Sequence, residues 1–150
     1  MKLNFIPAVP EDAQILFDWR NDPLTRAQSH QTEVLVWSDH LKWFEKSLQM
    51  PTRHIFFAVD RQDPGLEKLA TIRSDDLGEV KLLSWSVNPA MRGRGVGRAL
   101  LSQFIESLPG AYRAEIRKDN IASIKMARAA GFNCLGSEDQ FEVWTFDSKS

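Results

Sequence analysis

The segment SVNPAMRGRGVGRALLSQFIESL, residues 86–108, places a glycine-rich, basic turn between an apolar run and an amphipathic run. Glycines occupy positions 93, 95 and 97, and arginines occupy positions 92, 94 and 98. A helix that begins directly after such a turn presents unpaired backbone N–H groups and the positive end of its dipole. The segment therefore predicts an anion-binding turn at a helix N-terminus.

Two common nucleotide-binding loops do not match this turn. A P-loop ends in Gly-Lys-Ser/Thr, whereas Gly97 is followed by Arg98. A dinucleotide-binding G-x-G-x-x-G motif needs its third glycine at position 98 or 100, and these positions hold Arg98 and Leu100. The spacing therefore excludes both motifs.

The hydrophobic pattern around the turn predicts an α/β domain of three layers. Apolar alternation and turn residues predict strands at 3–9, 54–60, 68–74, 80–87, 111–117, 132–137 and 141–147. Helical spacing predicts about four helices, near 10–21, 38–50, 96–108 and 120–131, with Ser38 as an N-cap and residues 24–36 irregular. An antiparallel meander followed by a β-α-β crossover predicts a mixed, mostly antiparallel sheet of seven strands with a central β-α-β unit.

Length, net charge and cysteine content indicate the number of domains, the kinds of partner and the compartment. The 150 residues favour one domain, and a formal net charge of −1 gives no general attraction to nucleic acid or to an anionic membrane. The single cysteine, Cys134, excludes an internal disulfide and favours a reducing compartment, and we expect it to be a small buried residue. The start of the sequence lacks an apolar run of signal-peptide length, so we expect a cytoplasmic protein.

Three parts of the sequence resemble the GNAT superfamily of N-acetyltransferases. Arg92-x-x-Gly95-x-Gly97 is similar to the acetyl-CoA signature Q/R-x-x-G-x-G/A of that superfamily. The segment RAEIRKDNIASIKMARAAGF (113–132) resembles its fifth strand and following helix, and FIPAVPEDAQILFDW (5–19) resembles its opening strand and helix. Together these segments extend the resemblance over most of the chain.

The resemblance implies acetyl-CoA as co-substrate. In the superfamily, two parallel strands splay apart and the pantetheine arm lies along the fourth strand, with the pyrophosphate at the glycine-rich turn. Carried over by position, this implies a cofactor site formed by Trp85, Ser86, Val87, Arg92, Gly93, Arg94, Gly95, Val96, Gly97, Arg98, Asn120 and Ser123. A basic surface turn that merely begins a core-packed helix is the alternative.

Acetyl transfer to an amine needs a base for the ammonium proton and a way to neutralise the departing thiolate. By position, Glu115 matches the base of some ribosomal-protein N-acetyltransferases, although alternation along the strand is equally consistent with a solvated or structural acid. The superfamily often has tyrosine where this chain has Ala127, and Tyr112 lies outside that motif. A hydroxyl such as Ser123, a water, or unassisted departure are the alternatives.

The acceptor side should come from the N-terminal half. Trp19, Arg20 and Asn21, followed by His40 and Trp43, resemble the nucleotide-aminosugar N-acetyltransferases of the superfamily. The expected partner is therefore a small-molecule amine. Packing of the tryptophans between helices and sheet is an equally valid interpretation.

Two other function classes remain open, namely a protein N-terminal or lysine acetyltransferase and a non-catalytic CoA-binding module. The three histidines show no ligand spacing, so we assign no metal. Either a monomer or a homodimer is compatible with the sequence.

Overall fold

Seven strands form one mixed sheet in the order β1-β2-β3-β4-β5-β7-β6 in the computed structural model, which describes residues 1–63 and 65–149. Neighbouring strands are antiparallel except β4 and β5, which are parallel. The strands are β1 (Leu3–Pro7), β2 (Arg53–Asp60), β3 (Lys68–Asp76), β4 (Lys81–Val87), β5 (Ala111–Arg117), β6 (Asn133–Glu138) and β7 (Phe141–Asp147). The expected seven-stranded mixed sheet is confirmed.

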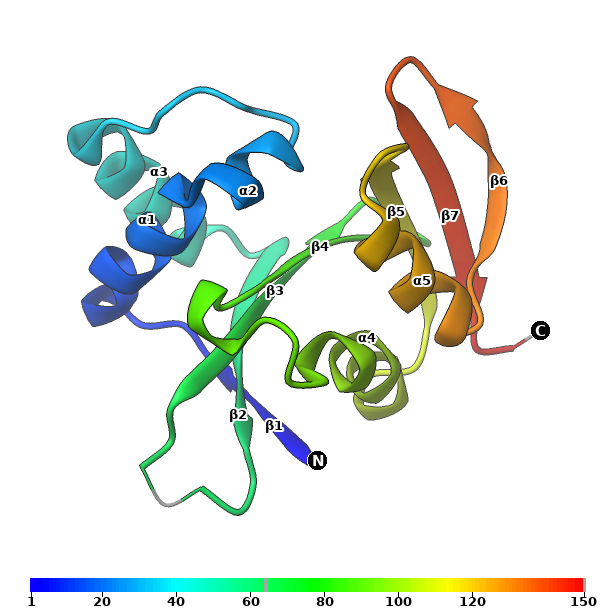
Figure 1. Ribbon diagram of the computed structural model, residues 1–150, viewed down its shortest axis with the longest axis horizontal. Helices are drawn as coiled ribbons and strands as arrows, with labels where there is room; N and C mark the ends of the chain where they lie inside the picture. Colours follow the sequence, from blue (N-terminus) through cyan, green and yellow to red (C-terminus); the bar gives the residue numbers. More distant parts are fainter. Residues whose placement is uncertain (64, 150) are drawn as a thin grey trace.

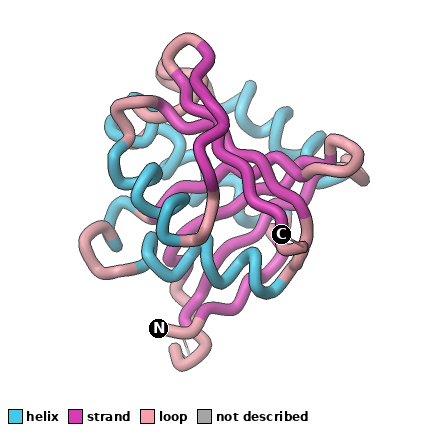
Figure 2. The backbone as a smooth tube through the Cα atoms, turned by 90° about the vertical axis from the view of Figure 1, so that its right-hand side faces the viewer, coloured by secondary structure: helices cyan, strands magenta, loops and turns pink. Residues whose placement is uncertain are grey.

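Helices lie on both faces of the sheet (Figures 1 and 2). They are α1 (Ala13–Asn21), α2 (Pro23–Ala27), α3 (Trp37–Gln49), α4 (Val96–Ser107) and α5 (Ile121–Ala129), with 3-10 turns η1 (Pro10–Asp12) and η2 (Pro89–Met91). Apolar side chains of α1 and α3 pack on β2, whereas those of α4 and α5 pack on β3, β5 and β7. Within the described residues, no helix has the length and apolar character needed to cross a membrane.

The structure corrects three local expectations. Residues 1–63 and 65–149 contain five α-helices rather than about four, because residues 24–27, expected to be irregular, belong to α2. Pro23 stands at the first position of α2, and the Asp22 side chain caps the helix by accepting from the Thr25 N–H. Helix α3 begins at Trp37 with Val36 as its N-cap residue, two residues before the N-cap expected at Ser38.

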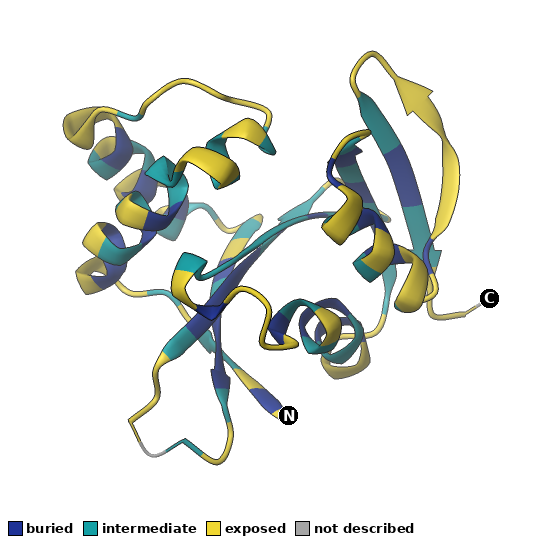
Figure 3. Cartoon of the chain, viewed as in Figure 1, coloured by how far each residue is buried: buried dark blue, intermediate teal, exposed yellow. Residues whose placement is uncertain are grey.

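Cys134 is exposed rather than buried. It lies on β6, whose residues are all exposed (Figure 3). The physical reason is that β6 is one of the two edge strands, pairs only with β7, and contributes no residue to the buried apolar clusters.

The parallel strands β4 and β5 separate partway along their length, which confirms the expected splay. They pair only from Lys81–Leu83 to Tyr112–Ala114. Beyond this point β4 keeps its pairing with β3 as far as Val87, and β5 keeps its pairing with β7 as far as Arg117. Residues 84–87 of β4 therefore have no partner on the β5 side, and their backbone polar groups there are available to a ligand.

Candidate active site

A cavity of about 830 Å³ opens where β4 and β5 separate. Its lining combines the glycine-rich turn, the free part of β4, the start of α5, and residues from α1, α2 and the loop after α2. All but one of the residues expected at the cofactor site line it, namely Trp85, Ser86, Val87, Arg92, Gly93, Gly95, Val96, Gly97, Arg98, Asn120 and Ser123. The exception, Arg94, is exposed outside the cavity. The sequence motif and the splay thus meet in one cavity.

The glycines of the turn serve two different purposes. Gly93 and Gly95 have φ angles of +78° and +82°, in the left-handed region that favours glycine, and Gly95 is the N-cap residue of α4. A Cβ at either position would meet no atom within 4 Å, which leaves room for a ligand to approach the backbone. At Gly97 a Cβ would come within 3.1 Å of Met126 Sδ, so this glycine permits close packing of α4 on α5.

Arg92 ties the glycine-rich turn to the opposite side of the cavity. Its Nη2 donates to an oxygen of Asp22, which caps α2, and to Thr25 Oγ1 at 3.1 Å. The hydrogen bond from Arg92 holds the pKa of the Asp22 carboxyl below its usual value. Arg92 therefore lines the cavity while its Nη2 is already hydrogen-bonded to Asp22 and Thr25.

Trp85, Asn120 and Ser123 are linked by hydrogen bonds at the point where the strands separate. Trp85 Nε1 donates to Ser123 Oγ at 3.2 Å, and the Ser123 N–H donates to Asn120 Oδ1 at 3.2 Å. Asn120 is buried as the N-cap residue of α5. Its side-chain oxygen thus serves the helix, a role that the sequence motif alone did not reveal.

Glu115 is the first residue of β5 beyond the pairing with β4, and it lines the cavity. Its Oε2 accepts from Arg113 Nη2 at 3.1 Å, and its Oε1 lies 3.4 Å from His30 Nε2. The His30 ring stacks on Phe141, with centroids 3.9 Å apart and planes 9° apart. The carboxylate is partly exposed and has a titratable neighbour.

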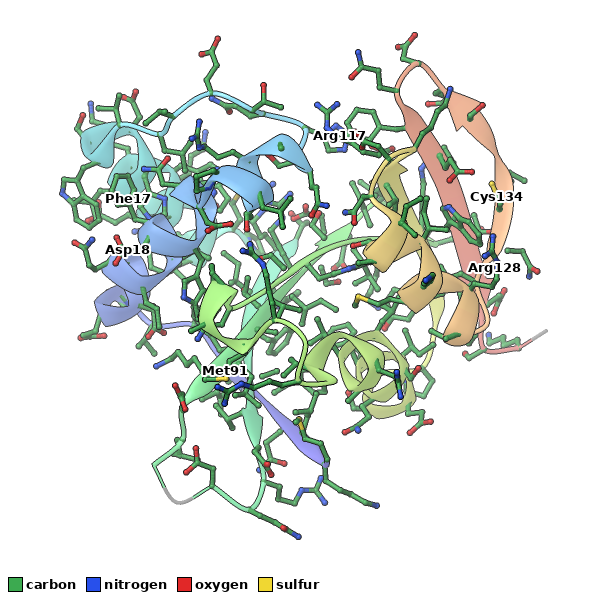
Figure 4. All side chains as sticks on the ribbon, viewed as in Figure 1. Phe17, Asp18, Met91, Arg117, Arg128 and Cys134 are labelled. Atoms are coloured by element: carbon green, nitrogen blue, oxygen red, sulfur yellow. The ribbon has the colours of Figure 1, made fainter. Side chains whose placement is uncertain are left out.

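His30 also lines the cavity, and sequence reasoning did not identify it. It belongs to the loop after α2, which Arg117 fixes by donating from Nε to the Ser29 carbonyl at 2.8 Å (Figure 4). No local pattern links residue 30 to residue 115. The proximity follows from a contact between the loop and β5.

Of the five residues expected to bind the acceptor, only Arg20 lines the cavity. Trp19 is buried and packs edge-on against Phe57, with centroids 5.6 Å apart. Asn21 makes two hydrogen bonds with the Leu35 backbone, at 2.7 and 3.2 Å, and so holds the loop after α2. These two side chains support the walls of the cavity, in line with the packing interpretation of Trp19.

His40 and Trp43 lie behind Arg20. His40 Nε2 is 2.8 Å from the Ala13 carbonyl and must donate to it, so Nδ1 accepts from Arg20 Nη1 at 3.0 Å. The Arg20 guanidinium lies 4.1 Å from the centre of the Trp43 ring. Burial, and then the charge of Arg20, lower the pKa of His40, which keeps the ring neutral. His40 thus positions Arg20.

This arrangement predicts a loss of stability in mild acid. Because the folded pKa of His40 is lowered from 6.5, the unfolded chain binds this proton more readily, and unfolding becomes easier as pH falls below 6.5. Urea unfolding between about pH 5 and pH 8 measures this dependence. His40→Gln should reduce the slope below pH 6.5, whereas His54→Gln, on an exposed part of β2, should not. Equal slopes for His40→Gln and wild type would contradict the assignment.

Tyr112 and Ala127, the latter in the position where the superfamily often has tyrosine, both lie in the core. Tyr112 is buried, and its hydroxyl donates to the Leu108 carbonyl. Ala127 is fully buried in the cluster beneath α5 and does not line the cavity. Ser123, one turn earlier on α5, does line it.

Two curated proteins match part of the chain. An uncharacterized protein of Mycobacterium leprae is 38% identical over 64 residues, which cover 42% of this chain and 18% of that protein. The N-alpha-acetyltransferase RimI of Mycobacterium tuberculosis is 36% identical over 59 residues, covering 39% of this chain and 37% of RimI. The matched segment therefore spans less than half of either relative.

Solved structures match nearly the whole fold at low sequence identity. A domain from Methanocaldococcus jannaschii has a TM-score of 0.81 at 20% identity, covering 97% of both chains. The aminoglycoside acetyltransferase AAC(6')-Ib with coenzyme A has a TM-score of 0.80 at 13% identity, covering 99% of this chain and 96% of its own. Spermidine N-acetyltransferase from Vibrio cholerae with CoA and spermine has a TM-score of 0.78 at 11% identity, covering 95% and 92%. These likenesses establish the fold.

A family model matches more of the sequence than either curated relative does. It is described as an acetyltransferase (GNAT) domain and matches residues 2–133. The matched range includes the glycine-rich turn, the splayed strands and the start of α5. With the fold and the cavity in agreement, the chain belongs to the GNAT acetyltransferase family.

Proposed function

We propose that the protein is an acetyl-CoA-dependent N-acetyltransferase that acts on a primary amine of a small molecule. One observation carries the proposal: a single cavity joins the glycine-rich turn at α4, the unpaired edge of β4 and the Glu115 carboxylate. The first two features suit a pyrophosphate and an amide chain, and the third suits an amine. Membership of the GNAT family and the CoA-bound proteins of similar fold support the same interpretation.

The hydrogen-bonding groups that line the cavity suit coenzyme A. The N–H groups at the start of α4, together with Arg98, would hold the pyrophosphate. The free backbone groups of residues 84–87 would pair with the amides of the pantetheine arm, as an added strand does. Acetyl-CoA supplies an acetyl group activated as a thioester. We expect no contribution from Arg94, which lies outside the cavity.

Glu115 would take the proton of the acceptor ammonium, directly or through water, so that the neutral nitrogen can form the amide as the carbon–sulfur bond breaks. Its Oε1 lies 3.4 Å from His30 Nε2, and the His30 side chain is 61% exposed. The imidazole therefore offers a route for this proton from Glu115 to solvent. Arg113 fixes the other carboxylate oxygen.

Ser123 is the residue we propose to pass a proton to the departing sulfur, while its oxygen takes the second proton that the nitrogen loses as the amide forms. Because Trp85 Nε1 donates to its oxygen, the Ser123 hydroxyl hydrogen is available for another acceptor in the cavity. Ser123→Ala should lower kcat by about 10- to 100-fold with little change in acetyl-CoA affinity. Steady-state kinetics and calorimetry separate the two effects. Ser107→Ala, outside the cavity on α4, is the matched control; an unchanged kcat in Ser123→Ala assigns the proton to water.

The acceptor we propose is a small-molecule amine, with nucleotide-linked aminosugars as one member of that class. The similar folds include enzymes named for aminoglycosides and spermidine, which are small amines. Release of free CoA thiol with amino sugars, polyamines, amino acids and peptide N-termini tests the proposal. Turnover with small amines supports it, preference for peptides indicates a protein acetyltransferase, and binding of acetyl-CoA without turnover indicates a non-catalytic CoA-binding module.

A further inference from the structure

Three arginines surround Trp43 at the acceptor side of the sheet. The guanidinium carbons of Arg20, Arg53 and Arg73 lie 4.1, 5.8 and 5.8 Å from the centre of the Trp43 ring. Arg20 comes from α1, whereas Arg53 and Arg73 come from the neighbouring strands β2 and β3. Arg20 and Arg73 line the cavity, and Arg53 does not. We call these three residues the arginine cluster.

The arginine cluster has one carboxylate, Asp75, for its three positive charges. Asp75 Oδ1 accepts from Arg53 Nε at 2.6 Å, and Oδ2 accepts from Arg73 Nε at 3.1 Å. Arg53 also donates to Ser47 Oγ at 3.0 Å. Both Asp75 oxygens are thus in use on the two strand arginines.

Arg20 has no ion-pair partner among residues 1–63 and 65–149. It is held by the neutral His40 ring and by the face of Trp43. Burial, with a smaller contribution from the charge of Arg73, lowers the pKa of Arg20 to about 10. An unneutralised cation in this setting is costly unless a ligand supplies the opposite charge.

The register places the arginine cluster and Glu115 on the same face of the sheet. Arg73 pairs with Ser84, which is the first residue of β4 beyond the pairing of Leu83 with Ala114. Glu115 is the corresponding first residue of β5. Arg73 and Glu115 therefore lie on the same face with β4 and the start of the opening between them, at least two strand spacings or about 10 Å apart at the backbone. Both line one cavity.

We propose that Arg20 and Arg73 bind an anionic group, a carboxylate or a phosphate, on the same small molecule whose amine is presented to Glu115. The inference rests on the proposed acetyltransferase function and narrows its acceptor to amines that are also acids. Two adjacent guanidinium groups present planar arrays of donors that match the oxygens of either anion. The short span between the cluster and Glu115 suits an amine and an acid separated by only a few bonds.

The charges of the whole cavity agree with this specificity. The lining residues include the cations Arg20, Arg73, Arg92, Arg98 and Lys125, whereas Glu115 is the only carboxylate among the described ones. The arginine cluster would repel a polycationic acceptor, and Glu115 alone could not neutralise its several positive charges. An acceptor with one amine and one acid matches one carboxylate and one arginine pair.

Matched acceptors test the proposal on the wild-type protein. Each ω-amino carboxylate is compared with its carboxamide, and phosphoethanolamine with ethanolamine, by release of free CoA thiol. We expect kcat/KM to be about 10- to 100-fold higher for the acid of at least one pair, as for a charge-assisted hydrogen bond of about 1.5–3 kcal/mol. The two sets of compounds distinguish carboxylate from phosphate. Equal use of acid and neutral partner would overturn the inference while leaving the acetyltransferase proposal in place.

Variants test whether Arg20 and Arg73 cause the preference for the acidic acceptor. In Arg73→Met and in Arg20→Met, the ratio of kcat/KM for the acid to kcat/KM for its neutral partner should fall to about one. Arg73→Lys, which keeps the charge but not the planar array, should restore part of the preference. Arg53→Met removes the member of the arginine cluster that lies outside the cavity, and this variant should retain the preference for the acid. Loss of the preference in Arg53→Met alone would contradict the assignment.

A binding measurement covers the case in which no acceptor is turned over. Calorimetry on the CoA-saturated protein compares the same acids and amides, with Arg73→Met as control. Binding of an acid but not of its amide, lost in Arg73→Met, would support the anion site even if the acetyltransferase proposal failed. Equal binding of acid and amide, or binding of neither, would overturn the anion site.

Discussion

Replacing Gly95 with aspartate should weaken acetyl-CoA binding by orders of magnitude in a folded protein. Gly95 is the N-cap residue of α4 with a φ angle of +82°, and its Cα side facing the cavity is open. Aspartate places a side chain and a negative charge where the pyrophosphate would approach the N–H groups of α4. Losing two charge-assisted hydrogen bonds, at about 1.5–3 kcal/mol each, weakens binding by roughly 10²- to 10⁴-fold. Isothermal titration calorimetry measures this loss.

Two control variants separate charge from backbone strain. Gly78→Asp introduces the same side chain at a φ angle of +96°, in the turn between β3 and β4 and outside the cavity. The Gly78→Asp protein should lose stability from the left-handed conformation of a non-glycine residue, but it should keep its affinity for acetyl-CoA. Gly95→Ala keeps the strain without the charge and should show an intermediate loss. Wild-type affinity in a folded Gly95→Asp protein would refute the cofactor site.

Replacing Glu115 with glutamine should lower turnover by about two to four orders of magnitude at neutral pH, with acetyl-CoA affinity unchanged. Glutamine keeps the shape of the side chain, and its amide cannot accept the ammonium proton. The loss should shrink as pH rises, because the acceptor then loses its proton to solvent unaided. The pH profile of kcat/KM for both proteins measures this difference.

Glu138→Gln is the matched control for this substitution. Glu138 also contacts Arg113, at 3.8 Å, but its side chain is 71% exposed and lies outside the cavity. It should keep wild-type turnover, which would show that the charge balance around Arg113 is not the cause. If Glu115→Gln retained wild-type turnover at every pH, a water molecule or the acceptor's own equilibrium would supply the base.

Local sequence patterns predicted most of the secondary structure but missed α2. The strand expected at 111–117 and the helix expected near 96–108 agree with β5 and α4 within a residue. A proline at position 23 is consistent with the expected end of the first helix near residue 21, but it is equally suited to the first position of a next helix when Asp22 can cap it. The proline alone does not show whether a helix ends before it or begins at it, because that depends on the backbone conformation of Asp22.

The acceptor side was predicted less completely than the cofactor side. The resemblance to the superfamily implied that Trp19, Arg20, His40 and Trp43 belong to the acceptor side, but it did not determine which of them face the cavity. Arg20 faces it because His40 and Trp43 hold the guanidinium from behind. Burial of Trp19 against Phe57 depends on how α1 packs on β2, a contact between distant parts of the chain.

The resemblance found in the sequence indicated the family and implied Glu115 as a candidate base, whereas the local pattern predicted the glycine-rich turn. The turn is a local property, because positive φ angles favour glycine and a helix N-terminus follows from its first residues. Only the tertiary structure brought His30 to Glu115 and set Arg73 beside Arg20, because β3, α1 and the loop after α2 meet through strand register and packing. Those contacts join residues far apart in the chain, and no repeating pattern along the sequence encodes them.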